Sequence, residues 1–249
     1  MTATPLVEGI WLVGSGEVAR SRSDPHDCHV YLVYDGTSAA LVDCGTGLGA
    51  PAILANVAEV CDLSAVGAVV CTHYHADHAG GIASLKRELE APVMASEATR
   101  DALQQADEEA TQVRAAREAG VYPPGFRLEA AAVDRVLGDG DEVAVGGLSL
   151  RAIETPGHCD GHLGFAVETP AGLGLFSGDC VFRGGHVSIQ AIPDCRVDRY
   201  AATLQRLNGL APEALFPGHA DIVCAGAAAG IAAAAASFAR LVPAPNLLR

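Results

Sequence analysis

The chain has 249 residues, of which 50% are hydrophobic and 18% are charged, a balance that excludes a disordered chain. Its net charge of −14 disfavours a nucleic-acid ligand, since an acidic surface repels a phosphate backbone. No apolar stretch reaches the roughly 18 residues of a membrane helix, and the first residues lack the pattern of a signal peptide. We therefore expect a cytoplasmic protein that binds neither nucleic acid nor membrane.

The first part of the chain predicts short strands joined by turns. Apolar runs at 9–13, 29–35 and 38–45 are separated by glycine, aspartate and serine, as is typical of strands and turns. Residues 48–61 have apolar positions three or four apart, which predicts a helix. The short, continuously apolar run 66–71 predicts a buried strand.

A histidine-rich segment, THYHADHAGG at residues 72–81, follows that buried strand directly. Within six positions it holds four titratable side chains: His73, His75, Asp77 and His78. The segment lies at the C-terminal end of a predicted strand, ahead of a helix expected near 82–90, where folds of alternating strands and helices place their ligands.

Residues 97–119 are the most charged part of the chain, and their apolar residues recur at helical spacing. This pattern predicts an amphipathic helix, which the glycine and prolines of GVYPPGF (120–126) end. A solvated surface helix explains the pattern. The alternative is that residues 97–126 form a helical insertion that covers the active site, because they interrupt two β-rich halves.

Strand patterns resume in the second half, including a hairpin expected to turn at 170–172, and a helix is expected over 197–208. Three of the predicted strands end at a side chain of metal-ligand type: His158, Asp179 and His219. A glycine precedes each of them, which allows the backbone to turn tightly and direct the next side chain into a cleft. An alanine-rich helix is expected near the C-terminus.

Five imidazoles and two carboxylates thus follow predicted strands, more than the three protein ligands of a typical catalytic zinc. They fit two metal ions that share one carboxylate. The set divides into two three-ligand sites and one bridge: His73, His75 and His158; Asp77, His78 and His219; and Asp179.

The sequence HYHADH at 73–78, with the later histidine, aspartate and histidine in order, resembles the HxHxDH signature of the metallo-β-lactamase superfamily. The resemblance covers nearly the whole chain, from residue 29 to 219. It implies an α+β four-layer αββα sandwich, formed here by a single domain over 1–249 with the helical insertion at about 97–126. It also implies metal-assisted hydrolysis with two divalent ions; we expect zinc first, and iron or manganese suits the same ligands.

The chemistry that this resemblance implies is concrete. Two metals roughly 3.5–4 Å apart lower the pKa of a water toward about 7, and the resulting hydroxide attacks a carbonyl or phosphorus. By the same resemblance Asp77 is both a ligand and a catalytic residue, which orients the hydroxide or passes a proton to the leaving group. We expect a small-molecule substrate with an ester, thioester, lactone or amide-like bond; the sequence indicates neither its identity nor the oligomeric state.

Asp179 bears on the branch of the superfamily, because the β-lactamases that share HxHxDH lack this aspartate. With this aspartate, the chain resembles glyoxalase II-like thioesterases, lactonases and phosphodiesterases. Quorum-quenching lactonases carry a tyrosine three residues later, where this chain has Phe182, so the resemblance to lactonases is weaker. One alternative is a mononuclear iron enzyme that resembles persulfide dioxygenases, with His73, His158 and Asp179 as ligands. A second is a non-catalytic metal-binding protein, which the complete ligand set disfavours.

Four further residues are candidates for substrate contacts. His26 and His29 precede a strand that often borders the site in this superfamily, and Arg183 and His186 follow Asp179 closely. An arginine and a histidine at a cleft mouth suit an anionic substrate group. For all four, a packed or surface role is the competing interpretation.

Overall fold

The computed structural model describes residues 2–247, so the extreme ends of the predicted domain 1–249 lie outside the described residues. The chain divides into two compact units. The first comprises Met1–Leu137 and Ala144–Gly147, and the second comprises Gly138–Val143 and Leu148–Arg249. That these units act as one domain stays a prediction.

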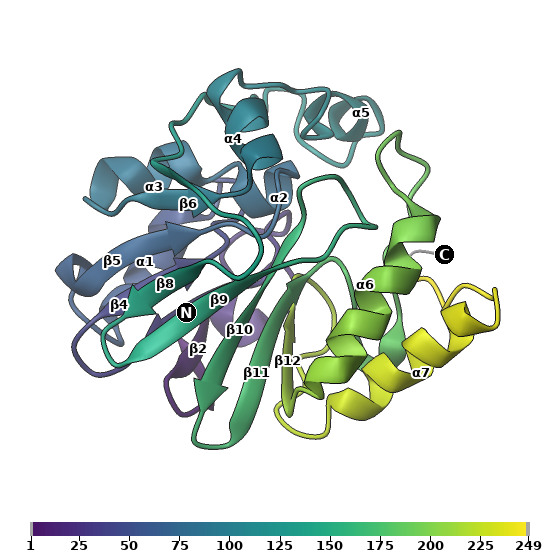
Figure 1. Cartoon of the computed structure of the whole chain (residues 1–249). Helices are drawn as coiled ribbons and strands as arrows, with labels where there is room; N and C mark the ends of the chain where they lie inside the picture. Colours follow the sequence, from purple (N-terminus) through teal and green to yellow (C-terminus); the bar gives the residue numbers. More distant parts are fainter. Residues whose placement is uncertain (1, 248–249) are drawn as a thin grey trace. The chain divides into compact units, whose positions relative to one another are not determined.

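Within the described residues, the first unit holds a seven-stranded mixed sheet whose strands lie in chain order. Figure 1 labels β2, β4, β5 and β6 of this sheet. Its strands are β1 (Thr4–Val7), β2 (Ile10–Gly14), β3 (Val30–Tyr34), β4 (Ala39–Val42), β5 (Val66–Val70), β6 (Val93–Ala95) and β7 (Arg135–Val136). Pairs from β1 to β4 are antiparallel, whereas pairs from β4 to β7 are parallel. Parallel pairing places the C-terminal ends of β4 and β5 side by side, where the histidine-rich segment begins.

Three helices of this unit follow these two strands in the chain: α1 (Ala50–Ala58) comes after β4, and α2 (Ala76–Ala79) and α3 (Ile82–Glu88) come after β5. Short 3₁₀ turns, η1 (Ala19–Ser21) and η2 (Leu63–Ala65), complete the connections. Ile53 and Val57 of α1 and Ile82 and Leu85 of α3 are buried in one apolar core with the strands. The predicted helices at 48–61 and 82–90 are therefore confirmed, with shorter ends.

The single long helix predicted over 97–119 is wrong, because the segment forms two helices, α4 (Glu97–Gln104) and α5 (Val113–Glu118). Between them the Asp107 carboxylate accepts the backbone N–H groups of Glu109 and Ala110. These side-chain hydrogen bonds replace the backbone hydrogen bonds of a continuous helix, because short polar side chains compete for backbone N–H groups. Ala106, with φ of 48° after α4, and Gln112, with φ of 62° before α5, take left-handed conformations that a continuous helix does not contain.

A five-stranded sheet in the order β12-β11-β10-β9-β8 lies in the second unit within the described residues, except that Ala144 and Val145 of β8 belong to the first unit. Its strands are β8 (Glu142–Val145), β9 (Leu148–Glu154), β10 (Leu163–Thr169), β11 (Gly172–Gly178) and β12 (Ala214–Pro217). β10 is antiparallel to both β9 and β11, and β12 is parallel to β11. The ends of β9, β11 and β12 therefore lie at one edge of the sheet, and each precedes a predicted ligand. The hairpin predicted to turn at 170–172 is confirmed.

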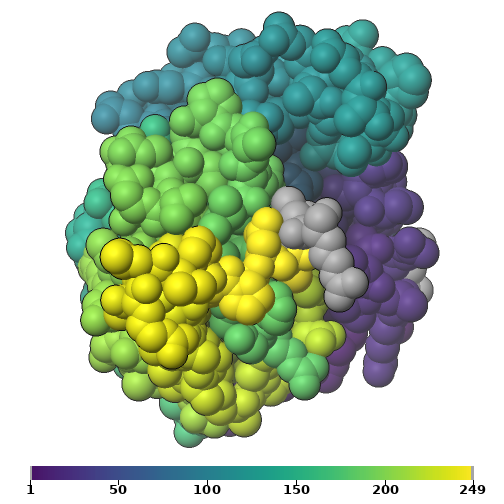
Figure 2. All heavy atoms as spheres, turned by 90° about the vertical axis from the view of Figure 1, so that its right-hand side faces the viewer, coloured from purple at the N-terminus to yellow at the C-terminus, as the bar shows by residue number. Residues whose placement is uncertain are grey.

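Two helices pack together on this unit, α6 (Val197–Leu210) and α7 (Ala228–Ala239). They bury Tyr200, Leu204, Ile231 and Phe238 in a core shared with the sheet. Figure 2 looks onto the side of the molecule where the atoms of α7, in yellow, are exposed. The predicted alanine-rich helix is thus confirmed. Among helices formed by residues 2–247, none is long and apolar enough to cross a membrane.

Candidate metal centre

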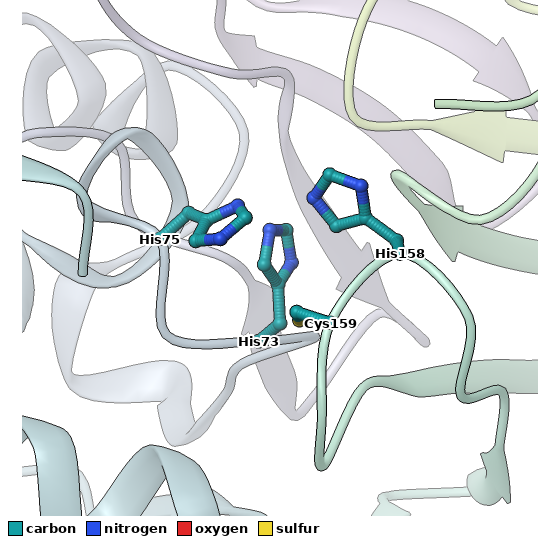
Figure 3. Close-up of side chains that lie close together, drawn as sticks. All are labelled: His73, His75, His158 and Cys159. Atoms are coloured by element: carbon teal, nitrogen blue, oxygen red, sulfur yellow. The ribbon is translucent and has the colours of Figure 1, made fainter. Parts of the chain in front are cut away.

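The histidine-rich segment gathers its side chains at the end of β5. The ring centroid of His73 lies 4.6 Å from that of His75 and 4.1 Å from that of His78. All three imidazoles are buried, and Figure 3 shows His73 and His75 on their loop. The single turn of α2 brings Asp77 Oδ2 to 3.7 Å from His78 Nε2. The first unit thus brings together the four predicted ligands of this segment.

Asp43 and Thr72 fix the orientation of two of these rings. His78 Nδ1 donates to Asp43 Oδ2 at 2.8 Å, and Asp43 Oδ1 accepts the Thr72 backbone N–H at 2.7 Å. The Thr72 hydroxyl donates to Asp43 and accepts from His73 Nδ1 at 3.0 Å. With their protons held at Nδ1, both rings present Nε2 as the metal-binding atom.

Asp43 was not among the residues predicted from the sequence, although a signal was present. Asp43 directly follows β4 and has φ of 61°, a left-handed conformation that aspartate tolerates better than most residues. The signal is an aspartate that directly follows a buried strand, one strand before the strand that ends in the histidines. Its pairing with His78 required knowing that β4 and β5 are parallel neighbours.

The second unit places Asp179 between two imidazoles. Asp179 Oδ2 lies 3.7 Å from His158 Nε2, and Asp179 Oδ1 lies 3.7 Å from His219 Nε2. These distances exceed those of hydrogen bonds. They match the roughly 3.3–4 Å expected between two ligands that lie about 2.0–2.2 Å from one zinc ion. Each oxygen of one carboxylate thus faces a different imidazole, which is the arrangement that a bridging ligand needs.

His158 is held by a carbonyl from a distant loop. Its Nδ1 donates to Ser188 O at 3.0 Å, and the Tyr200 hydroxyl donates to the same oxygen at 2.9 Å. Gly157, with φ of 147°, lies against the Tyr200 ring, and an added Cβ would be 2.7 Å from Tyr200 Cγ. Figure 3 shows the His158 side chain on this loop. No sequence signal identifies Ser188 or Tyr200, because they follow His158 by thirty residues or more.

The donors in each unit fit a divalent metal ion. They are imidazole nitrogens and carboxylate oxygens, which suit zinc, iron and manganese. The Nε2 atoms of His73, His75 and His78 are buried, so an ion bound there would be shielded from bulk water. Three of the rings have Nδ1 occupied by an oriented partner, as metal-bound histidines usually do.

Buried cysteines near the ligands have a packing role. Burial raises the pKa of the Cys28, Cys44 and Cys180 thiols, so all three stay protonated. Cys44 donates to His78 O at 3.0 Å, which is consistent with packing. Cys180 is buried as well.

The first two candidate substrate contacts differ in their surroundings. His26 is part-exposed; its Nδ1 lies 2.7 Å from Asp24 Oδ1, and its ring meets Tyr122 edge-on at 5.9 Å. His29 is buried, with Nδ1 2.9 Å from Ser15 Oγ. The burial of His29 favours packing, whereas His26 keeps an accessible edge.

Of the other two candidates, Arg183 begins the short turn η3 (Arg183–Gly185), and His186 follows it directly. Arg183 is exposed and pairs with Asp221 at 2.8 Å. His186 Nδ1 lies 3.0 Å from Arg183 O. The Arg183 charge is thus already balanced by a carboxylate, and a substrate role for either residue stays a prediction.

Comparison with known proteins identifies the family. A model described as the metallo-beta-lactamase superfamily matches residues 23–219, a range that includes all seven predicted ligands. A hydroxyacylglutathione hydrolase of Rhodopseudomonas palustris is 30% identical over 155 residues, which cover 62% of this chain and 48% of that protein. Thioesterase pkgB of Emericella nidulans is 28% identical over 198 residues, which cover 78% and 46% respectively. The chain thus spans about half the length of these relatives.

Solved structures show the same fold. A metallo-beta-lactamase of Cronobacter sakazakii has a TM-score of 0.73 at 22% identity, covering 97% of this chain and 94% of that one. BJP-1, a subclass B3 metallo-beta-lactamase of Bradyrhizobium japonicum, has a TM-score of 0.72 at 21% identity, covering 96% and 91%. The predicted α+β fold class is confirmed. With the family model matching most of its length, the chain belongs to the metallo-β-lactamase superfamily.

Proposed function

We propose that this chain is a hydrolase whose seven ligand side chains bind two divalent metal ions, zinc first among them. The observation that carries the proposal is Asp179, whose two oxygens face the Nε2 atoms of two different histidines. The ligand set alone suits the mononuclear iron dioxygenase as well. The relatives named as a hydrolase and a thioesterase support the hydrolase over the dioxygenase and the non-catalytic metal-binding protein.

The substrate class that we propose is a small thioester. Two of the relatives are named as a hydroxyacylglutathione hydrolase and a thioesterase. A thioester contains the carbonyl carbon that this chemistry attacks, and its thiolate leaves readily. Esters, lactones and amide-like bonds remain in the wider class that the same site would serve.

The metal ligands and the residues that orient them would have different roles around the reacting carbonyl. Bound metals would supply a water whose pKa is near 7 and would polarise the carbonyl oxygen. The Asp77 side chain is 24% exposed, so its carboxylate reaches both the ligand cluster and solvent. We assign to Asp77 the transfer of a proton to the leaving group, in addition to metal binding. Asp43 and Thr72 keep His73 and His78 in the productive orientation.

One wall of the substrate site is proposed to come from His26 and the insertion. Backbone hydrogen bonds tie both segments to the ligand loop, since Ala76 N donates to Thr111 O and Cys28 N donates to Asp77 O, each at 3.2 Å. Tyr122 of the insertion packs on Phe126 at 4.7 Å and meets His26 edge-on. The side chains of Tyr122 and Phe126 would contact the acyl group of the substrate.

Metal analysis combined with thioester turnover tests this function. We expect about two zinc, manganese or iron ions per chain, and release of thiol from acyl-glutathione thioesters that a chelator abolishes and zinc restores. Asp179→Asn is expected to lose about 100-fold or more of the turnover, because even partners of ligands typically cost 10–100-fold. Glu168→Gln, an exposed acidic residue on β10, is the matched control. One iron per chain with thiol-dependent oxygen uptake would instead support the dioxygenase.

A further inference from the structure

His162 lies on the loop between β9 and β10, and it is buried with 1% of its surface exposed. Its Nδ1 is 2.7 Å from the hydroxyl oxygen of Thr155, the first residue after β9. Its Nε2 is 3.2 Å from the backbone nitrogen of Asp179, the first residue after β11. The imidazole therefore links the ends of two strands that both precede predicted ligands.

The direction of these two hydrogen bonds is determined by their partners. The Asp179 backbone N–H donates, so His162 Nε2 accepts and the ring proton is on Nδ1. The Thr155 hydroxyl points its own proton toward His162 O at 3.5 Å, and its oxygen accepts from Nδ1. Thr155 N also donates to His162 O at 2.9 Å, which fixes the loop. Every contact in this group is consistent with one neutral tautomer.

The Asp179 backbone needs such an anchor because β11 ends directly before it. Gly178 takes φ of 48°, and Cys180 N donates back to Ser177 O at 3.0 Å, so residues 177–180 form a tight turn. Within this turn the Asp179 N–H points outward to His162. The Asp179 carboxylate must meet two histidines at once, and ligand constellations tolerate errors of only about 0.5 Å.

We propose that His162 is a positioning residue for metal binding, which holds the Asp179 backbone so that both carboxylate oxygens face their histidines. The inference rests on the proposed function, because it takes Asp179 as the bridging ligand. It assigns a role to a histidine that is not itself placed among the ligands. Its effect reaches the metals through one backbone hydrogen bond.

Two substitutions of His162 separate positioning from packing. In His162→Gln, the side-chain oxygen reaches the position of Nε2 and can still accept the Asp179 N–H. In His162→Asn, the shorter side chain reaches only the position of Nδ1 and can bond Thr155 alone. Both replace a buried ring by a smaller amide, so both lose packing to a similar degree.

We expect zinc affinity, measured by competition with a chromophoric chelator, to fall about 10- to 100-fold in His162→Asn and by less than about threefold in His162→Gln. Melting temperatures of the two metal-free variants should agree within a few degrees. Equal zinc affinity in the two variants would overturn the inference.

A second measurement reads the tautomer without metal or substrate. Long-range ¹H–¹⁵N NMR spectra of the metal-free wild-type protein should show the His162 proton on Nδ1. A proton on Nε2 would refute the inference, even if neither variant folds. Failure of the wild-type protein to bind two metals would overturn the proposed function, whereas the tautomer decides the role of His162 separately.

Discussion

Replacing Asp43 by asparagine is the sharpest test of how the ligand rings are oriented. The amide oxygen can still accept the Thr72 N–H, which lies 2.7 Å from Asp43 Oδ1. The amide nitrogen then faces His78 Nδ1, which donates to Asp43 Oδ2 at 2.8 Å in the native protein. Two donors would meet, so the ring shifts its proton to Nε2. In that tautomer His78 cannot bind a metal ion.

The structure sets the size of the expected effect. The side chains of His78 and Asp43 are 0% and 3% exposed, so their hydrogen bond is shielded from water. A hydrogen bond to a charged partner contributes about 1.5–3 kcal/mol. Since about 1.4 kcal/mol corresponds to a tenfold change in an equilibrium constant, zinc affinity should fall about 10- to 100-fold.

Zinc affinity of the Asp43→Asn variant is best measured by competition with a chromophoric chelator. Asp62→Asn is the control, because it removes the same charge from an exposed position before η2. We expect the control to match the wild-type protein. Wild-type affinity in a folded Asp43→Asn variant would refute the assignment of Asp43 as the group that orients His78.

Two further predictions concern stability. Gly157→Ala should destabilise the protein by about 2 kcal/mol or more in chemical denaturation, because its Cβ would meet the Tyr200 ring at φ of 147°. Gly209→Ala, at an open position in α6, should instead stabilise it by about 0.5–1 kcal/mol, and a similar loss in both variants would contradict this reasoning. The pKa of Asp35 lies well below its usual range because its carboxylate accepts the backbone N–H groups of Ser38, Gly147 and Thr37. A lowered folded pKa stabilises the protein above the ordinary pKa of about 4, and this contribution is lost as the pH falls toward the folded value. The difference in free energy of unfolding between the wild-type protein and Asp35→Asn should therefore shrink as the pH falls from 6 to 3. A difference that stays constant over this range would contradict the prediction.

The sequence alone was sufficient to predict the elements whose signal lies in neighbouring residues. The predicted helices at 48–61, 82–90 and 197–208 formed because apolar periodicity is a property of neighbouring residues. The HYHADH segment and the later ligand positions stood out because each follows a strand and a backbone turn. The helix expected over 97–119 failed for a local reason too, since the Asp107 side chain competes for the backbone N–H groups that a continuous helix would use.

Tertiary structure decided which residues support the ligands. Asp43 contacts His78, and Ser188 contacts His158, across separations of 35 and 30 residues. His162 contacts the Asp179 backbone across 17 residues. The physical reason is that these hydrogen bonds depend on which strand ends and loops the folded sheets bring together. Strand order and direction are set by the burial of whole apolar faces, and no short segment of sequence contains that information.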